Sequence, residues 1–199
     1  MTMMTNGKNQ GVKRGLIIVV SEYDNFENLD FCKHDGEAIY GTLKSIGYEI
    51  PDRYKLIGKV EYSKVRDAII EFFTDETLNA NDILLSYISG YGLLANKADD
   101  LYLSSSEIHP KVPRLRGFSF DELVMTMQEC RSRKIFTILN CFCDNTTSVT
   151  NGNTTNGAAL GQRIIENKST IKNVFLRRVD HCRMYLFSKH TIIALSHFS

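Results

Sequence analysis

The chain has 199 residues, a length that suits one domain with a substantial hydrophobic core. Its 24 basic and 23 acidic side chains nearly balance, so no overall field attracts nucleic acid or an anionic membrane, and we expect neither as a partner. No apolar run is long enough to span a bilayer, and the polar first ten residues lack the apolar core of a signal peptide.

Short apolar runs alternate with amphipathic stretches along the chain, which is typical of parallel strands joined by crossover helices. The expected buried strands are residues 15–20, 53–57, 83–88 and 135–139. Because these runs are almost uniformly apolar, both faces of the sheet must be covered. The sequence therefore predicts a three-layer α/β domain with a mostly parallel central sheet flanked by helices.

Helices are expected between these strands. The first begins at Asp35, where apolar residues start to recur at helical spacing, and ends at Gly47. Ser63 and Ser119 are the expected N-caps of the next two helices. A further helix is expected at residues 158–165.

One domain is expected at residues 13–170, after a flexible N-terminus at residues 1–12. Residues 144–156 are rich in Asn and Thr, which indicates a surface loop. Residues 171–199 show no convincing strand, and we interpret them as a divergent or shortened C-terminal segment of the same domain. An edge of the sheet would then be open to another chain.

Two strand ends carry the most informative motifs. Residues 83–92 read Ile-Leu-Leu-Ser-Tyr-Ile-Ser-Gly-Tyr-Gly, and residues 135–143 read Ile-Phe-Thr-Ile-Leu-Asn-Cys-Phe-Cys. Parallel strands bring their carboxyl ends, and usually their functional sites, to one edge of the sheet. We therefore expect Tyr91 and Phe142 to lie close together at this edge. Taken separately, either residue is also an ordinary aromatic side chain packing at the end of a strand.

These strand ends resemble those of caspase-type cysteine peptidases, which include the metacaspases. In that family the first strand ends Ser-Gly-His-Gly and the second ends Asp-(Ala/Cys)-Cys. Here Tyr91 stands at the histidine position and Phe142 at the nucleophile position. A thiolate nucleophile needs a nearby imidazole, whereas phenylalanine has no nucleophilic atom and a phenol titrates at about 10. The resemblance implies a caspase-like fold and a catalytically inactive pseudopeptidase with a binding or regulatory role.

Further motifs extend the resemblance over roughly residues 13–165. Residues 23–29 are similar to the family's Tyr-x-x-Phe-x-x-Leu loop, and residues 43–48 to its Leu-x-x-Leu-Gly-Phe helix end. Cys32 and Asp35 match the metacaspase Cys-x-x-Asp segment. An ordered series of motifs at compatible separations is far rarer than any single match.

The resemblance also implies a substrate-binding pocket for a basic side chain. The positions that line it in metacaspases correspond here to Cys32, Asp35, Ser89 and Asn140. Asn140 replaces an aspartate, so one of two negative charges is absent, and a desolvated Arg or Lys would be held less well. A protein or peptide is the expected partner, including an active caspase-like relative.

An active cysteine endopeptidase with a preference for basic residues is the alternative. Cys141 or Cys143 would be the relocated nucleophile, with His34 or a histidine of the tail as the base. Alternation along a strand aims Cys141 away from the face of Phe142, and Cys143, two residues further along, would share the face of Cys141. Errors of about an ångström in position can lower the rate a hundredfold, which disfavours both.

No cofactor or metal is expected. Asp99 and Asp100 resemble the acidic calcium loop of metacaspases, but Ca²⁺ requires six or more oxygen ligands. The five cysteines are an odd number and widely spaced, which indicates reduced thiols and a cytoplasmic location. A nucleotide-binding α/β protein is excluded because no glycine-rich phosphate loop follows the first strand.

Overall fold

The computed structural model of the chain describes residues 11–95, 100–142, 173–179 and 182–188. Within these residues the strands of the main sheet lie in the order β2-β1-β3-β6-β8-β7. Their bounds are β1 Lys13–Val20, β2 Lys55–Gly58, β3 Ile83–Leu94, β6 Lys134–Phe142, β7 Asn173–Val179 and β8 Cys182–Ser188. Strands β2, β1, β3 and β6 are parallel, whereas β8 and β7 are antiparallel to their neighbours.

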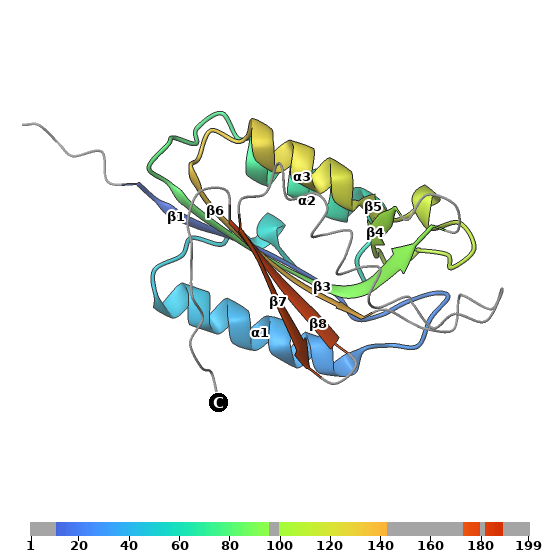
Figure 1. Ribbon diagram of the computed structural model, residues 1–199. Helices are drawn as coiled ribbons and strands as arrows, with labels where there is room; N and C mark the ends of the chain where they lie inside the picture. Colours follow the sequence, from blue (N-terminus) through green and yellow to red (C-terminus); the bar gives the residue numbers. More distant parts are fainter. Residues whose placement is uncertain (1–10, 96–99, 143–172, 180–181, 189–199) are drawn as a thin grey trace, which may run out of the picture.

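Helices cover both faces of this sheet (Figure 1). Helix α1 (Asp30–Ser45) lies on one face, and α2 (Tyr62–Thr74) and α3 (Phe120–Glu129) lie on the other. The three-layer α/β architecture expected from the apolar runs is therefore confirmed. None of the helices in the described part of the chain is both long and apolar enough to cross a bilayer.

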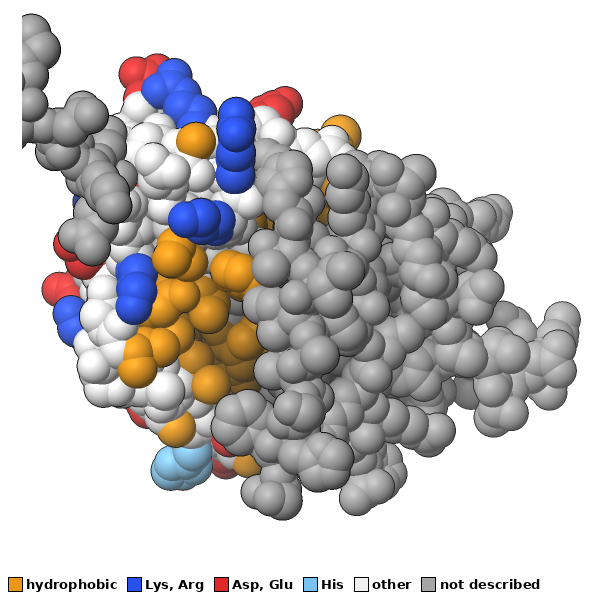
Figure 2. Space-filling model, turned by 60° about the vertical axis from the view of Figure 1, so that its left-hand side comes forward, with side chains coloured by type: hydrophobic (Ala, Val, Ile, Leu, Met, Phe, Trp, Pro, Cys, Tyr) orange, Lys and Arg blue, Asp and Glu red, His pale blue; other side chains and the backbone are white. Residues whose placement is uncertain are grey.

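The hydrophobic core is centred on β1, whose residues from Leu16 to Val20 are all buried. Helix α1 packs closely on this strand because Gly36 has no side chain, and a Cβ at that position would lie 2.7 Å from Val19 Cγ2. On one face of the molecule, hydrophobic side chains reach the surface and lie beside lysine and arginine side chains (Figure 2). Apolar and basic side chains thus share the surface on that face.

A buried carboxylate joins the loops at the amino edge of the sheet. Asp82, immediately before β3, is 0% exposed. Its oxygens accept the backbone N–H of Val12 at 2.8 Å, the backbone N–H of Asn79 at 3.0 Å and the side-chain amide of Asn79 at 2.8 Å. The starts of β1 and β3 are therefore tied together by one side chain.

A small extension of the sheet lies beyond its carboxyl edge (Figure 1). There β3 continues past the other parallel strands and pairs antiparallel with β4 (Leu101–Leu103), which pairs in turn with β5 (Phe118–Ser119). Strand β3 is therefore longer than the expected residues 83–88. Its extra length carries the Ser-Gly-Tyr-Gly motif.

Several element boundaries differ from the sequence-based expectations. Helix α1 begins at Asp30, more than a turn before Asp35. Ser63 is not an N-cap because α2 already begins at Tyr62, whose backbone N–H donates to the carboxylate of Glu107 at 2.8 Å. Ser119 occupies the N-cap position of α3, but its side chain makes no capping hydrogen bond. A carboxylate distant in the sequence thus replaces the expected local cap of α2.

The second and fourth strands are also shifted from their predicted bounds. Residues 52–54 form a 3-10 turn, so β2 starts at Lys55 rather than at residue 53. Strand β6 continues three residues beyond the expected end at residue 139, through Phe142. Phe142, at the nucleophile position, and the two residues before it are therefore part of the regular sheet.

The C-terminal segment contains the strands β7 and β8, where the sequence indicated none. Strand β8 pairs with β6 and β7 pairs with β8, so the outer strands of the main sheet in the described part of the chain are β2 and β7. Arginines at positions 177, 178 and 183 interrupt the apolar runs and weaken the strand signal. The helix expected at residues 158–165 and the flexible N-terminus, apart from residues 11 and 12, lie outside the described residues.

Candidate functional site

The two motif strands are neighbours, and their register sets the geometry of the site. In the parallel pair β3 and β6, Ser89 is paired with Asn140, Gly90 with Cys141, and Tyr91 with Phe142. Side chains alternate between the faces of a sheet, so Tyr91 and Phe142 share one face and Cys141 points to the other. The ring of Phe142 contacts α1, which identifies the shared face as the one that α1 covers.

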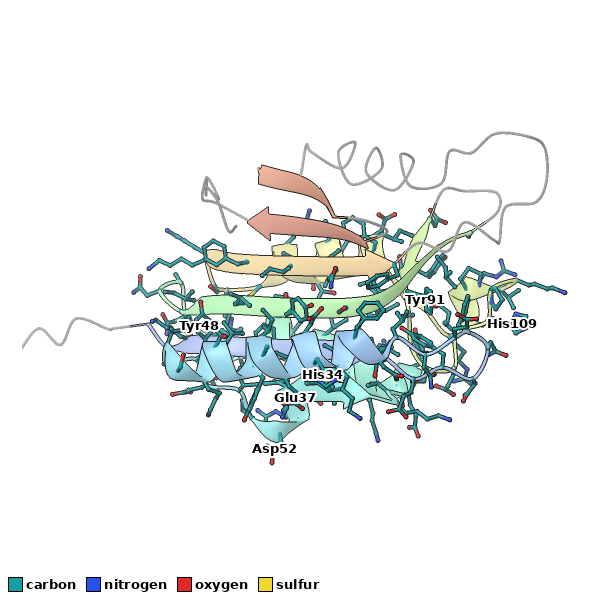
Figure 3. All side chains as sticks on the ribbon, turned by 90° about the horizontal axis from the view of Figure 1, so that it is seen from below. His34, Glu37, Tyr48, Asp52, Tyr91 and His109 are labelled. Atoms are coloured by element: carbon teal, nitrogen blue, oxygen red, sulfur yellow. The ribbon has the colours of Figure 1, made fainter. Side chains whose placement is uncertain are left out.

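Five aromatic side chains gather at this end of the sheet and are called here the aromatic cluster. The Tyr91 ring stacks on Phe26 with centroids 4.8 Å apart and meets Tyr23 edge-on at 4.9 Å. The Phe142 ring meets Phe31 of α1 edge-on at 4.8 Å. Figure 3 shows Tyr91 at the carboxyl end of the sheet, on the side where α1 begins. Aromatic packing therefore occupies the place where the resemblance puts a catalytic dyad.

The Tyr23 hydroxyl holds the end of β3 against the end of β1. It donates to the carbonyl of Val20 at 2.6 Å, accepts the backbone N–H of Tyr91 at 3.0 Å, and lies 2.9 Å from Ser104 Oγ. Burial raises the pKa of this phenol well above its usual value, so it stays neutral. Gly90 leaves the necessary space, since a Cβ there would lie 2.6 Å from the Tyr23 oxygen.

A polar cluster lies on the same face of the sheet and consists of Cys32, Tyr87, Ser89 and Asn140. The Asn140 amide donates to the Tyr87 hydroxyl at 3.2 Å and to Ser89 Oγ at 3.4 Å. Burial raises the pKa of the Cys32 thiol to about 11, although a hydrogen bond with Ser89 offsets part of the shift. Burial likewise raises the pKa of Tyr87 to about 12. All four groups are therefore neutral near pH 7.

Asp35 lies beside the polar cluster and not inside it. It is exposed on α1, one turn beyond Cys32. Its negative charge contributes to the raised pKa values of both Cys32 and Tyr87, so its carboxylate is close to them. The structure thus brings the four residues of the expected substrate pocket to one region, with three of them buried and Asp35 at the surface.

Tyr87 and Phe31 belong to this region but were missed from the sequence. Alternation could have identified Tyr87, because residues 87, 89 and 91 are two apart and share one face of β3. Phe31 had no comparable signal, since the helix was expected to begin after it. Its contact with Phe142 joins residues 111 positions apart, which no local pattern predicts.

The residues expected for a relocated active site do not come together in the described part of the chain. Cys141 is 2% exposed and lies on the opposite face from Phe142, near Gly92. His34 is exposed on α1 (Figure 3). Cys143 lies outside the described residues, as do the tail histidines.

The suggested calcium loop is only partly described, since Asp100 is placed and Asp99 is not. Among the placed side chains, no group of three or more His, Cys, Asp or Glu residues could hold a metal ion. One buried side-chain atom of the described region has no hydrogen-bond partner, the Oγ of Ser21, which directly follows β1 at the same carboxyl edge.

The three-layer fold and its two adjacent strand ends define a caspase-type domain. A family model described as the caspase domain matches residues 12–175, which is most of the chain. The chain therefore belongs to the caspase domain family. No curated protein matches it.

Proposed function

We propose that this caspase domain does not cleave peptides and acts instead by binding a protein or peptide in the cytoplasm. The observation that carries the proposal is the pairing of Tyr91 with Phe142 on adjacent strands, at the positions that match the histidine and cysteine of the family. Both components of the dyad are replaced by residues that pack as aromatic side chains.

Neither replacement supplies the chemistry of a cysteine peptidase. Phe142 has no atom that can attack a carbonyl carbon. The Tyr91 hydroxyl already donates to the carbonyl of Glu27 at 3.3 Å, and a phenol is a poor base near neutral pH. Cys141 is the nearest described thiol along the chain, and it faces the other side of the sheet. The alternative of an active endopeptidase therefore depends on Cys143.

The polar cluster and Asp35 support a remaining role in recognition. Hydroxyl, thiol and amide groups stay grouped near one exposed carboxylate, which suits a ligand with a positively charged side chain. Asn140 carries no charge, so the electrostatic attraction is weaker than with two carboxylates. A basic peptide segment, including one from an active caspase-like relative, is the partner class that we propose.

The unmodified chain is expected to show no turnover of fluorogenic peptides that carry Arg, Lys or Asp before the scissile bond, with or without calcium. The physical reason is the lack of both a thiolate and an imidazole on the shared face of β3 and β6. Release of the fluorophore is measured against a buffer blank. Activity that disappears in Cys143→Ala or Cys141→Ala would overturn the proposal and identify the nucleophile.

Repairing one catalytic position is expected to leave the chain inactive in the same assay. Nucleophile and base act as a unit, so Phe142→Cys and Tyr91→His alone each lack half of the machinery. Only the double replacement restores both groups on one face. Substantial turnover by the Phe142→Cys single variant would show that another residue serves as the base.

Binding of an Arg- or Lys-containing peptide is expected to weaken by about threefold in Asp35→Ala, because a partly solvated ion pair contributes on the order of 0.5–1 kcal/mol. Fluorescence anisotropy with a labelled peptide measures the change. Asp52→Ala is the matched control, since Asp52 is an exposed carboxylate far from the aromatic cluster (Figure 3). Equal affinities of Asp35→Ala and the unmodified chain would show that Asp35 is only a helix residue.

A further inference from the structure

Opposite charges gather at the two ends of helix α1, although the whole chain has a net charge of +1. Residues 21–37, which lead into the helix and form its start, contain six acidic side chains and one lysine. At the other end, Lys44 lies in the last turn and Lys13 Nζ donates to the carbonyl of Ile46 at 3.0 Å. The molecule therefore carries an acidic surface and a basic surface, separated by the length of a 16-residue helix.

The basic surface contains Lys13, Lys44 and Lys134. Lys13 and Lys134 lie in one row of the sheet, because both are paired in register with Ile83 between them. All three lysines are exposed, and none makes an ion pair with the described residues. One acidic residue, Glu49, is joined to Lys13 by a backbone hydrogen bond. The surface thus keeps a net positive charge.

Apolar side chains lie within the basic surface. Ile46, directly after α1, is 52% exposed. Leu85 and Phe136 are paired in register two residues beyond Ile83 and Lys134, so they share the face of the sheet that α1 covers, and both are half-buried. The side chains of β6 on the opposite face are fully buried, namely Ile135, Thr137 and Leu139. Figure 2, in which this end of the molecule is turned forward, shows hydrophobic side chains between lysine and arginine side chains.

The acidic surface contains Glu27, Asp30 and Asp35, with the ring of Phe31 beside them. None of the three carboxylates makes an ion pair with the described residues. Phe31 is 49% exposed. Phe31 and Ile46 are two of the five large apolar side chains that are exposed in the described part of the chain, and they mark the two ends of one helix. Each surface therefore combines three unpaired charges with an exposed apolar side chain.

We infer that the acidic surface of one copy of this chain binds the basic surface of a second copy. Charge complementarity identifies the occupant, because each surface presents to the other the charge that it lacks. Burial of Phe31 and Ile46 supplies the apolar contribution that exposed ion pairs by themselves do not. The inference goes beyond the proposed peptide binding, since it does not use the polar cluster and shares only Asp35 with that site.

The dipole of α1 explains only part of this distribution of charge. It favours Asp30 in the first turn and Lys44 in the last turn. Lys13 and Lys134 lie on strands, and Glu27 lies three residues before the helix, so the dipole does not require them. Nor does it require an exposed apolar side chain at each end. An interface between copies accounts for all of these features together.

Sedimentation velocity of the full chain tests the inference at concentrations from about 10 to about 500 μM. We expect self-association in about 50 mM NaCl that weakens about tenfold in about 500 mM NaCl, because salt screens the opposed charges. Glu27→Lys with Asp30→Lys reverses the acidic surface, and Lys44→Glu with Lys134→Glu reverses the basic surface. Each double variant alone is expected to stay monomeric. An equimolar mixture of the two should associate again, because each variant retains one native surface.

Lys111→Glu with Arg114→Glu is the matched control, since it makes the same change of charge at two exposed basic positions outside both surfaces. This control is expected to associate like the unmodified chain. An unmodified chain that stays monomeric at every concentration would overturn the inference. Association that persists in both double variants would place the contact elsewhere and overturn it too. A mixture of the two variants that stays monomeric would show that the acidic and basic surfaces do not face each other.

Discussion

Gly90→Ala is expected to lower the free energy of unfolding by about 4 kcal/mol, as the sum of backbone strain and overpacking. Gly90 has a φ of +149°, which side-chain-bearing residues rarely adopt. The new Cβ would lie 2.6 Å from the Tyr23 hydroxyl oxygen, 2.8 Å from Ser104 Oγ and 3.1 Å from the carbonyl oxygen of Val20. All three atoms take part in the hydrogen bonds of the Tyr23 hydroxyl, which hold the end of β3 in place. Urea unfolding followed by circular dichroism measures the loss.

Gly41→Ala is the matched control for this prediction. Gly41 lies in α1 and a Cβ there meets no atom within 4 Å, so we expect unchanged or slightly higher stability from the better helix propensity of alanine. A loss of less than about 1 kcal/mol in Gly90→Ala would show that the loop around Tyr23 adapts easily. The packing of the aromatic cluster, which strand register sets, would then not be rigid.

Asp82→Ala is expected to lower the free energy of unfolding by about 3 kcal/mol, because it leaves buried donors without partners. The carboxylate is fully buried and accepts three hydrogen bonds, from the backbone N–H of Val12 and from the backbone and side-chain N–H groups of Asn79. These bonds join the start of β1 to the loop before β3. Amide hydrogen exchange should accelerate first at Val12 and Asn79.

Asp67→Ala is the control for Asp82→Ala, because it removes a carboxylate that is exposed and not buried. Asp67 is exposed on α2 and only approaches Arg66, at 3.7 Å, so its removal is expected to change stability by no more than about 0.5 kcal/mol. If the two variants lost equal stability, net charge and not the buried hydrogen bonds would explain the effect. Neither substitution touches the aromatic cluster or the polar cluster.

The four parallel strands and their flanking helices could be predicted because each leaves a local pattern. Apolar runs of strand length indicated the strands, and helical spacing indicated the helices between them. The adjacency of Tyr91 and Phe142 followed from one further rule, that parallel strands end at the same edge. The family itself was visible in the order and spacing of short motifs, and the caspase domain match agrees with it.

The boundaries and the packing around the site depended on contacts between distant residues. Helix α1 begins earlier than its periodicity indicated because its first turn has tertiary contacts: Phe31 meets Phe142 of β6, and the buried Cys32 thiol has a hydrogen bond with Ser89 of β3. The N-terminus of α2 is capped by Glu107, which lies 45 residues away in the sequence. Strand β8 pairs with β6, and β7 pairs with β8, so these strands depend on long-range pairing that their weak local propensity did not reveal.

Sequence alone thus determined which residue types stand at positions 91 and 142, where the family motifs place a histidine and a cysteine. Only the tertiary structure decided what those residues do instead. Tyr91 packs against Phe26 and Tyr23, and Phe142 against Phe31, through contacts set by strand register and by the position of α1. The physical reason is that a missing functional group is a property of one residue, whereas an aromatic cluster exists only when separate segments are brought together.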